Sequence, residues 1–190
     1  MTSVAFLMLC AAALLGVALL AVASARSQAA TSIVYGATLV ITLAAVAASV
    51  AALIGRGAPA GLALPIGLPW TGAHFRVDVL AAFFLCVVNV GGAAASLYGI
   101  GYGQHEDEPH RVLPFFPAFL AGMNLVVMAN DAFSYLLSWE FMSLASWALV
   151  IAHHQDPDNR RAGFVYLIMA GIGTLSLLLA LGLLAGPDGN

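Results

Sequence analysis

Charged side chains are scarce in this sequence, and lysine is absent. Charged residues make up 8% of the 190 positions, whereas hydrophobic residues make up 62%. A soluble domain carries about 25% charged residues because water must solvate its surface. So few charges cannot cover a water-exposed surface, and the composition therefore indicates an integral membrane protein with lipid as its solvent.

The same scarcity excludes several classes of function. The six basic residues are all arginines and the net charge is −3, so there is no basic patch for a nucleic acid. Cys10 and Cys86 lie inside apolar runs, which favours buried thiols over a disulfide framework. The sequence has no nucleotide fingerprint, phosphate loop or nucleophile elbow. We therefore expect no cofactor and no metal in this chain.

What is abundant is long apolar sequence. A helix needs about 20 mostly apolar residues to cross the hydrocarbon core. Six segments meet or approach this length: Ser3 to Ala23, Thr31 to Ile54, Asp78 to Tyr98, Val112 to Ala129, Ala132 to Ala152, and Gly163 to Ala185. The predicted fold is thus an all-α bundle of six transmembrane helices.

The segments between these helices define the expected organisation. Residues 1–55 hold two helices, and 56–77 form an external segment whose prolines and glycines favour an extended or hairpin-like path. Residues 78–185 hold four helices, and 186–190 form an external tail. The triplet Ala23-Ser24-Ala25 is similar to a signal-peptide cleavage site, but no Arg or Lys precedes the apolar run, which is longer than a signal core. We therefore expect a first membrane span.

Arginine positions predict the orientation. Cytoplasmic loops carry an excess of Lys and Arg. With the amino terminus outside, the inside loops hold four arginines, Arg26, Arg111, Arg160 and Arg161. The outside loops then hold two, Arg56 and Arg76. This bias predicts a multi-pass protein of the inner (plasma) membrane with both ends outside.

Glu140 is the candidate for chemistry. It lies well inside the fifth segment, in AFSYLLSWEFMSLASWALVIA, so its carboxyl falls near the bilayer midplane. An ionisable side chain there costs at least about 2.5–3.5 kcal/mol to insert and by default indicates an ion or proton pathway. The alternative is a buried glutamate that only holds helices together. At helical spacing Glu140 shares a face with Ser143, a candidate hydrogen-bond partner.

Other polar residues have structural explanations beside functional ones. Asp78 and Asp131 begin predicted helices, where capping competes with a transport role. Asn89 and Asn124 lie inside segments, where hydrogen bonds between helices compete with a lining role for a water chain. Four aromatic residues are typical of the membrane interface: Trp70, Tyr98, Tyr102 and Trp147. A cluster of polar residues indicates a solvated loop: His105, Glu106, Asp107, Glu108 and His110. The adjacent histidines His153 and His154 point in different directions on a helix, which argues against a shared metal site.

One stretch carries a family resemblance. FFPAFLAGMNLVVMANDAFSYLLSWEFMSLASWALVIAHH resembles the proton-pumping antiporter-like subunits of respiratory complex I and its relatives, with MAND ending one helix and SWEFMSLAS at the centre of the next. FMSLAS looks closer to hydrogenase-4 component B and the matching formate hydrogenlyase membrane subunit. DVLAAFF and RRAGFVYLIMAGIGTLSLLL also fit. The resemblance covers residues 76 to 185 well and the first two segments only by hydropathy.

The resemblance implies a fold of about fourteen helices with two inverted five-helix units, each containing a broken helix. It implies that Glu140 matches a glutamate of the fifth helix, which pairs with a lysine of the seventh. It also implies no redox cofactor in the subunit, since electrons move in a peripheral arm of the complex. This sequence contains no lysine and ends after the sixth segment. We therefore expect an N-terminal piece of a longer protein, or a truncated or split gene.

Three functional hypotheses follow. The first is the N-terminal part of a proton-translocating subunit in a hydrogenase-4-like or NADH-quinone oxidoreductase-like complex, with Glu140 as relay and Ser143, Asn124, Asp131 and Asp78 as candidate supporting residues. The second is a subunit of a multi-subunit Na+/H+ antiporter, and the third is a non-catalytic scaffold. The expected partners are the lipid bilayer and other membrane subunits.

Overall fold

The computed structural model describes residues 3–24, 30–55, 60–65, 72–103 and 109–185. Several residues considered above lie outside these ranges, namely Arg26, Arg56, Trp70, His105 to Glu108, and the tail 186–190. Each of the six apolar segments contains an α-helix: α1 (Ser3–Ala23), α2 (Ala30–Ile54), α3 (Val79–Tyr102), α4 (Phe115–Met128), α5 (Ala132–Val150) and α6 (Pro157–Ala185).

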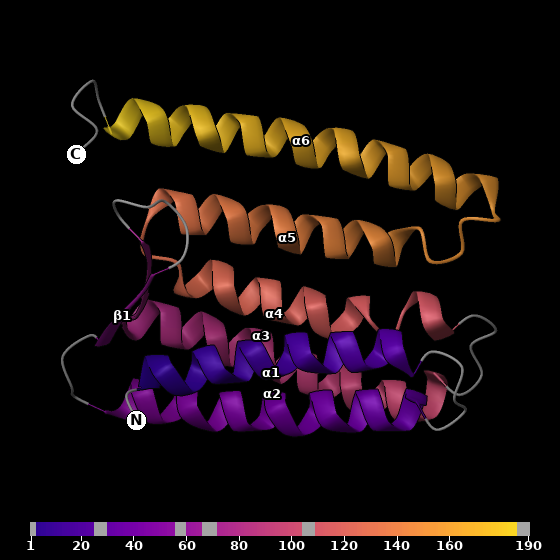
Figure 1. The fold of residues 1–190 in the computed structure, drawn as a ribbon, viewed down its shortest axis with the longest axis horizontal. Helices are drawn as coiled ribbons and strands as arrows, with labels where there is room; N and C mark the ends of the chain where they lie inside the picture. Colours follow the sequence, from indigo (N-terminus) through magenta and orange to yellow (C-terminus); the bar gives the residue numbers. More distant parts are fainter. Residues whose placement is uncertain (1–2, 25–29, 56–59, 66–71, 104–108, 186–190) are drawn as a thin grey trace.

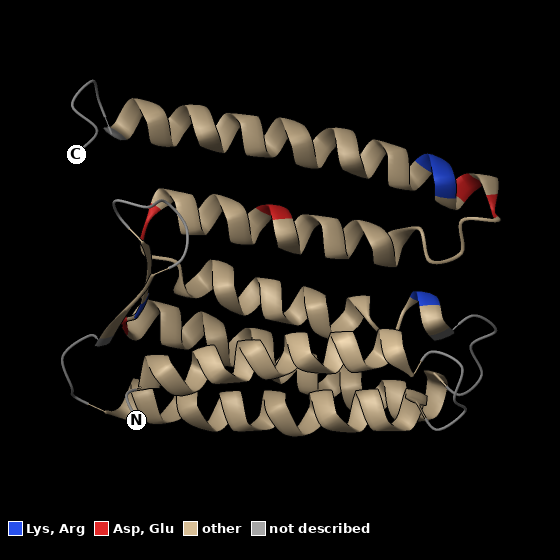
Figure 2. Ribbon diagram, viewed as in Figure 1, with Lys and Arg blue, Asp and Glu red and all other residues tan. Residues whose placement is uncertain are grey.

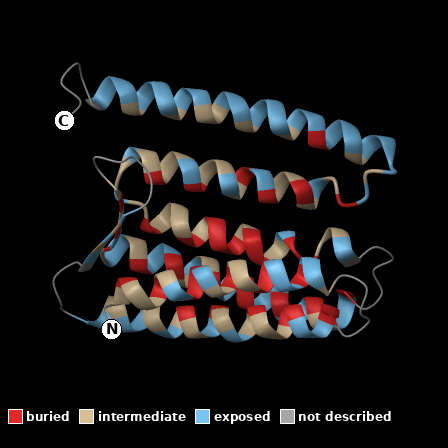
Figure 3. Cartoon of the chain, viewed as in Figure 1, coloured by how far each residue is buried: buried red, intermediate tan, exposed pale blue. Residues whose placement is uncertain are grey.

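The helices lie side by side, and successive helices run in opposite directions (Figure 1). The start of α1 and the end of α6 therefore lie at the same end of the molecule. α1 to α4 enclose the apolar core, in which Leu7, Leu14 and Leu85 are completely or almost completely buried. α6 lies at the edge, packs mainly against α5, and is exposed along nearly its whole length (Figure 3).

Within the described residues, four helices are long and apolar enough to cross a membrane: α1, α2, α3 and residues Pro157–Leu184 of α6. α4 has 14 residues, which span about 21 Å at about 1.5 Å each, against a hydrocarbon core of about 30 Å. α5 has 19 residues, and its serines and Glu140 lower its hydropathy. Length and composition thus support four spans, and passage of α4 and α5 through the bilayer stays a prediction.

Several helix boundaries differ from the expectation, as where α3 continues to Tyr102 rather than ending at Tyr98, and the starts of α4 and α6 differ for identifiable reasons. α4 begins at Phe115 rather than Val112, after a short 3-10 helix η2 (Pro109–Arg111) and with Pro114 as its N-cap residue. α6 begins at Pro157, six residues before the expected Gly163. Proline is favoured at the first position of a helix, and Asp156 Oδ1 accepts the N–H of Asp158 at 2.9 Å. The loop expected there is therefore partly helical.

Residues between α2 and α3 form a β-hairpin, so the chain is mostly rather than wholly helical. Strands β1 (Ala60–Leu64) and β2 (Ala73–Val77) pair antiparallel, with Leu62 opposite Phe75. β2 also forms an isolated bridge from Phe75 to Ala129, in the turn between α4 and α5. The hairpin thus tethers the end of the bundle where α5 begins.

Glycine allows close approach of two helix pairs that position the polar residues. A Cβ at Gly122 in α4 would lie 2.9 Å from the Met142 Cα in α5, a separation that real Cβ atoms do not tolerate. A Cβ at Gly99 in α3 would lie 2.5 Å from the ring of Tyr35 in α2. Both contacts fix the depth of one helix relative to its neighbour.

Candidate functional site

Glu140 occupies the middle of α5. It is the ninth of the 19 residues of that helix, which places its Cα about 12 Å from the helix start at about 1.5 Å per residue. Charged residues otherwise gather at the two ends of the bundle, with one acidic position at mid-length of α5 (Figure 2). The side chain is partly buried. Its position therefore differs from that of every other acidic residue that the structure describes.

The carboxyl of Glu140 contacts the neighbouring helix. Thr174 in α6 donates a hydrogen bond from its Oγ1 to Glu140 Oε1. Ser143, the candidate partner predicted from the sequence, is buried on α5, but the hydrogen bond recorded at Glu140 comes from Thr174. Glu140 therefore faces the boundary between α5 and α6, where a hydroxyl from another helix meets it.

Sequence reasoning missed Thr174, and counting residues from the turn does not find it. α5 ends 10 residues after Glu140, whereas α6 begins 17 residues before Thr174. Equal counts from the turn would therefore pair Glu140 with a different residue of α6. The contact depends on the register of the two helices, which no local pattern gives.

Asn89 and Asn124 form a buried pair between α3 and α4. Asn89 Nδ2 donates to Asn124 Oδ1 at 2.7 Å, and Asn124 Nδ2 donates back to Asn89 Oδ1 at 3.4 Å. Each amide also donates to a carbonyl of its own helix, at Leu85 and Leu120. The predicted hydrogen bonding between helices is thus confirmed.

The asparagine pair and Glu140 share one depth. Gly122 in α4 lies against Met142 in α5, and these helices are antiparallel (Figure 1). Moving two residues along each helix brings Asn124 level with Glu140. The structure therefore puts Asn89, Asn124, Glu140 and Thr174 in one layer across four consecutive helices, as two hydrogen-bonded pairs.

Asp131 caps α5 and also holds the hairpin. Its Oδ1 accepts the backbone N–H of Ser134 at 2.7 Å, and its Oδ2 accepts the Ser134 hydroxyl at 2.6 Å and the backbone N–H of His74 at 2.7 Å. Burial acts to raise the pKa of Asp131, but the hydrogen bonds from Ser134 and His74 outweigh it and hold the pKa below its ordinary value of 3.8. The capping prediction for this residue is confirmed.

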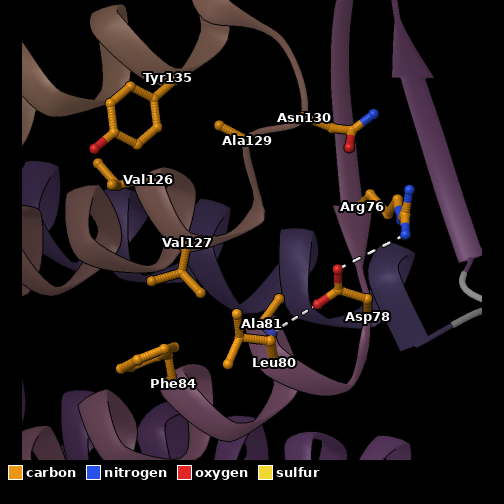
Figure 4. A pocket seen from close by; sticks show the side chains of 10 residues that line it. All are labelled: Arg76, Asp78, Leu80, Ala81, Phe84, Val126, Val127, Ala129, Asn130 and Tyr135. Atoms are coloured by element: carbon orange, nitrogen blue, oxygen red, sulfur yellow. Dashed lines mark hydrogen bonds and ion pairs between the residues drawn. The ribbon is translucent and has the colours of Figure 1, made fainter. Parts of the chain in front are cut away.

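Asp78 caps α3 in the same way, with its Oδ1 accepting the N–H of Ala81 at 2.8 Å. Its other carboxylate oxygen lies 3.7 Å from Arg76 Nη2. These two residues line a pocket of about 460 Å³ at the hairpin end of the bundle (Figure 4). Asp78 is therefore distant from Glu140 along the axis of the helix bundle.

The opposite end of the bundle holds a second polar contact. The Arg111 guanidinium, just before α4, meets the imidazole ring of His154, just after α5. Arg160 donates from Nη1 to the carbonyls of His154 and Gln155 at 3.2 and 3.3 Å. These contacts stabilise the turn between α5 and α6, at the opposite end of the bundle from the hairpin and away from the layer that contains Glu140.

Comparison with known proteins shows which family this chain resembles. Residues 129–190, which include Glu140 and Thr174, match the NADH:quinone oxidoreductase/Mrp antiporter transmembrane family. The chain is related to the antiporter-like membrane subunits of complex I and hydrogenase-4. The apolar helices of the described residues are consistent with a multi-pass membrane protein.

Individual relatives agree with the family match. This antiporter-like chain is 32% identical to hydrogenase-4 component B of Escherichia coli over 117 residues, which are 60% of this chain and 17% of that protein. It is 28% identical to NADH-quinone oxidoreductase subunit L of Escherichia coli over 119 residues, 63% of this chain and 19% of that protein. The chain thus spans about a fifth of the length of these relatives.

A solved structure shares the fold. The match is a chain of the membrane-bound sulfane sulfur reductase, an archaeal respiratory membrane complex, with a TM-score of 0.72 and 20% identity over 94% of this chain and 37% of that chain. At this identity the likeness concerns the fold alone. The fold match includes the first two helices, whereas the motifs of the sequence resemblance begin only at residue 76.

Proposed function

We propose that this chain forms part of a proton-translocating membrane subunit of a hydrogenase-4-like or NADH-quinone oxidoreductase-like complex in an inner (plasma) membrane. In this proposal the Glu140 carboxyl takes up and releases a proton in the middle of the bilayer. The observation that carries it is a carboxyl at mid-length of α5, in contact with a hydroxyl from α6.

The energetic cost of this residue favours a function. A carboxylate in the middle of a membrane helix costs at least about 2.5–3.5 kcal/mol on insertion scales. One threonine hydroxyl satisfies part of its hydrogen-bonding capacity, since a carboxylate accepts at about four lone-pair sites. If helix packing alone were needed there, an uncharged side chain would serve at lower cost.

The site leaves room for a cationic partner from elsewhere. Glu140 is only partly buried, and α6 beside it is largely exposed, as at Leu175 with 67% of its surface accessible. Among the described residues, the arginines lie near the helix ends rather than at this depth. We propose that a lysine from another segment or subunit approaches Glu140 across the α5–α6 boundary, as the resemblance implies.

Asn89 and Asn124 extend the polar layer towards α2. In the proposed relay they hold the layer together and provide amides that can orient water, while Glu140 and Thr174 handle the proton. Ser143 remains a candidate supporting residue one turn from Glu140. Asp78 and Asp131 act mainly as helix caps in this proposal, because their carboxylates lie at the hairpin end.

A second candidate is a subunit of a multi-subunit Na+/H+ antiporter. The family match favours it equally, because the family description includes Mrp antiporters. The two proposals differ in whether sodium moves. A scaffold without ion transport is the third alternative.

The test uses the full-length protein in its native complex, in sealed vesicles. Glu140→Gln removes the titrating proton and keeps the shape of the side chain, so proton uptake should fall at least about tenfold. Asp156→Asn, an acid-to-amide change in the exposed turn before α6, is the matched control and should leave uptake unchanged. Unaltered uptake in Glu140→Gln would remove this residue from the relay.

Two further readings distinguish the alternatives. Sodium-dependent uptake that is lost in Glu140→Gln would support the antiporter, and no ion movement in the unaltered complex would support the scaffold.

Thr174→Val removes the hydroxyl that donates to Glu140 and should reduce proton uptake less than Glu140→Gln does. Ser176→Ala is its control, because the Ser176 hydroxyl donates to Ile172 of its own helix at 2.8 Å.

A further inference from the structure

A pocket of about 460 Å³ opens at the hairpin end of the bundle, away from the polar layer. It lies between β2, the start of α3, the end of α4 and the start of α5 (Figure 4). Because α3 is a candidate membrane span and Asp78 caps its first turn, the pocket lies at the level where a membrane span begins. This is the depth of lipid headgroups.

The lining of the pocket divides into a polar part and an apolar part. Arg76, Asp78 and Asn130 supply the polar part, next to the hairpin. Leu80 and Phe84 belong to the apolar part, and they are 66% and 48% exposed. The apolar wall is therefore continuous with the outer surface of α3, which faces lipid.

The two charges in the pocket are incompletely paired. Arg76 Nη2 and Asp78 Oδ2 are 3.7 Å apart, beyond hydrogen-bond distance, and their side chains are 46% and 44% exposed. Asp78 Oδ1 is occupied by the N–H of Ala81, which leaves Oδ2 able to accept. Arginine has five N–H donors in a planar fork that matches a phosphate. Donor and acceptor capacity of both signs thus remains available.

We propose that this pocket binds a phospholipid whose headgroup carries a phosphate and a primary ammonium group, as in phosphatidylethanolamine. The phosphate lies against Arg76, the ammonium donates to Asp78 Oδ2, and one acyl chain runs down the Leu80 and Phe84 wall. Tyr135, at the apolar side of the pocket, is suited to the boundary between headgroup and acyl chain.

Headgroup chemistry distinguishes this lipid from the other common ones. A choline headgroup carries the same two charges, but its quaternary ammonium has no N–H to donate to Asp78. An anionic glycerol headgroup offers a phosphate to Arg76 and nothing cationic to Asp78, whose carboxylate then repels the lipid. A headgroup with a phosphate and a primary ammonium satisfies both residues, the phosphate at Arg76 and the ammonium at Asp78.

The experiment is native mass spectrometry of the full-length protein, stripped of lipid in mild detergent and titrated with phosphatidylethanolamine, phosphatidylcholine or phosphatidylglycerol. Phosphatidylethanolamine should bind about fivefold more tightly than the other two, the scale of one exposed ion pair. Arg76→Gln should weaken the binding of all three lipids, because each of them carries the phosphate that Arg76 contacts in this proposal. Arg160→Gln, at the opposite end of the bundle, should leave all three affinities unchanged.

A second variant separates lipid recognition from folding. Asp78→Asn keeps the α3 cap, because asparagine caps as well as aspartate does, and should shift the preference towards phosphatidylglycerol. Equal binding of the three lipids by the unaltered protein, or an unchanged affinity in Arg76→Gln, would overturn the proposal. Displacement of the lipid by soluble phosphoethanolamine at similar concentration would also overturn it, by assigning the pocket to a soluble compound. None of these readings depends on proton transport by Glu140.

Discussion

The buried pair Asn89 and Asn124 allows a quantitative test of the polar layer. One hydrogen bond of the pair is short, at 2.7 Å, and the other is long, at 3.4 Å. Hydrogen bonds between membrane helices average about 0.6 kcal/mol and reach about 1.7 kcal/mol. One good and one weak bond therefore predict a coupling free energy of about 1 kcal/mol between the two side chains.

The assay is a double-mutant cycle on the free energy of unfolding in detergent. Asn89→Ala and Asn124→Ala should each destabilise the protein by about 1–3 kcal/mol, because each leaves a buried amide without its partner. The double variant should be less destabilised than the two single effects together, by about 1 kcal/mol. The cavity terms largely cancel in the cycle.

A matched cycle controls for indirect effects. Ser96 is buried on α3, seven residues after Asn89, and donates to Gly92 of its own helix at 2.7 Å. Ser96→Ala combined with Asn124→Ala should be additive to within about 0.5 kcal/mol. A coupling near zero for the asparagine pair, or an equal one for the control, would refute the hydrogen-bonded pair.

Two further predictions concern the elements that position α5. In a thermal unfolding assay, Gly122→Ala should destabilise the protein by about 1–3 kcal/mol, because the new Cβ would lie 2.9 Å from Met142 Cα. Gly91→Ala is the control and should be neutral or stabilising, because a Cβ at Gly91 would have no neighbouring atom within 4 Å. Asp131→Ala should cost about 1–2 kcal/mol through the lost cap and the lost tether to His74. The pKa of Asp131 in the folded protein is lowered from 3.8. The ionised carboxylate therefore stabilises the folded state fully above pH 3.8, and this contribution is lost as pH falls through the lowered pKa. The difference in stability between Asp131→Ala and the parent should accordingly shrink in acid. A difference that is constant with pH would show that the charge of Asp131 contributes nothing.

The sequence predicted the elements that depend on local physics. Apolar length located all six helices, and an aspartate ahead of an apolar run located the caps at Asp78 and Asp131. Pro157 and Asp158 also carried a local signal, the preference of proline and acidic residues for the first turn of a helix. The polar character of HHQDPDNRR instead favours a loop, which is why the predicted start of the sixth helix lies six residues after the observed one.

Contacts between distant segments were harder to predict. Asp131 receives the N–H of His74, which lies 57 residues earlier, and no local pattern links them. The Thr174 contact with Glu140 depends on the register of α5 and α6, which in turn depends on where α6 begins. Asn89 and Asn124 were expected to bond between helices, but pairing them with each other required the depth of α3 relative to α4.

The central claim is that the Glu140 carboxyl lies in apolar surroundings within the membrane and carries an exchangeable proton. Dicyclohexylcarbodiimide is apolar and reacts with protonated carboxyls, so treatment of native membrane vesicles followed by peptide mass spectrometry tests it directly. We expect modification at Glu140 that increases as pH is lowered and is absent with a water-soluble carbodiimide. Equal modification by the water-soluble reagent would place the carboxyl at the aqueous boundary and contradict the account.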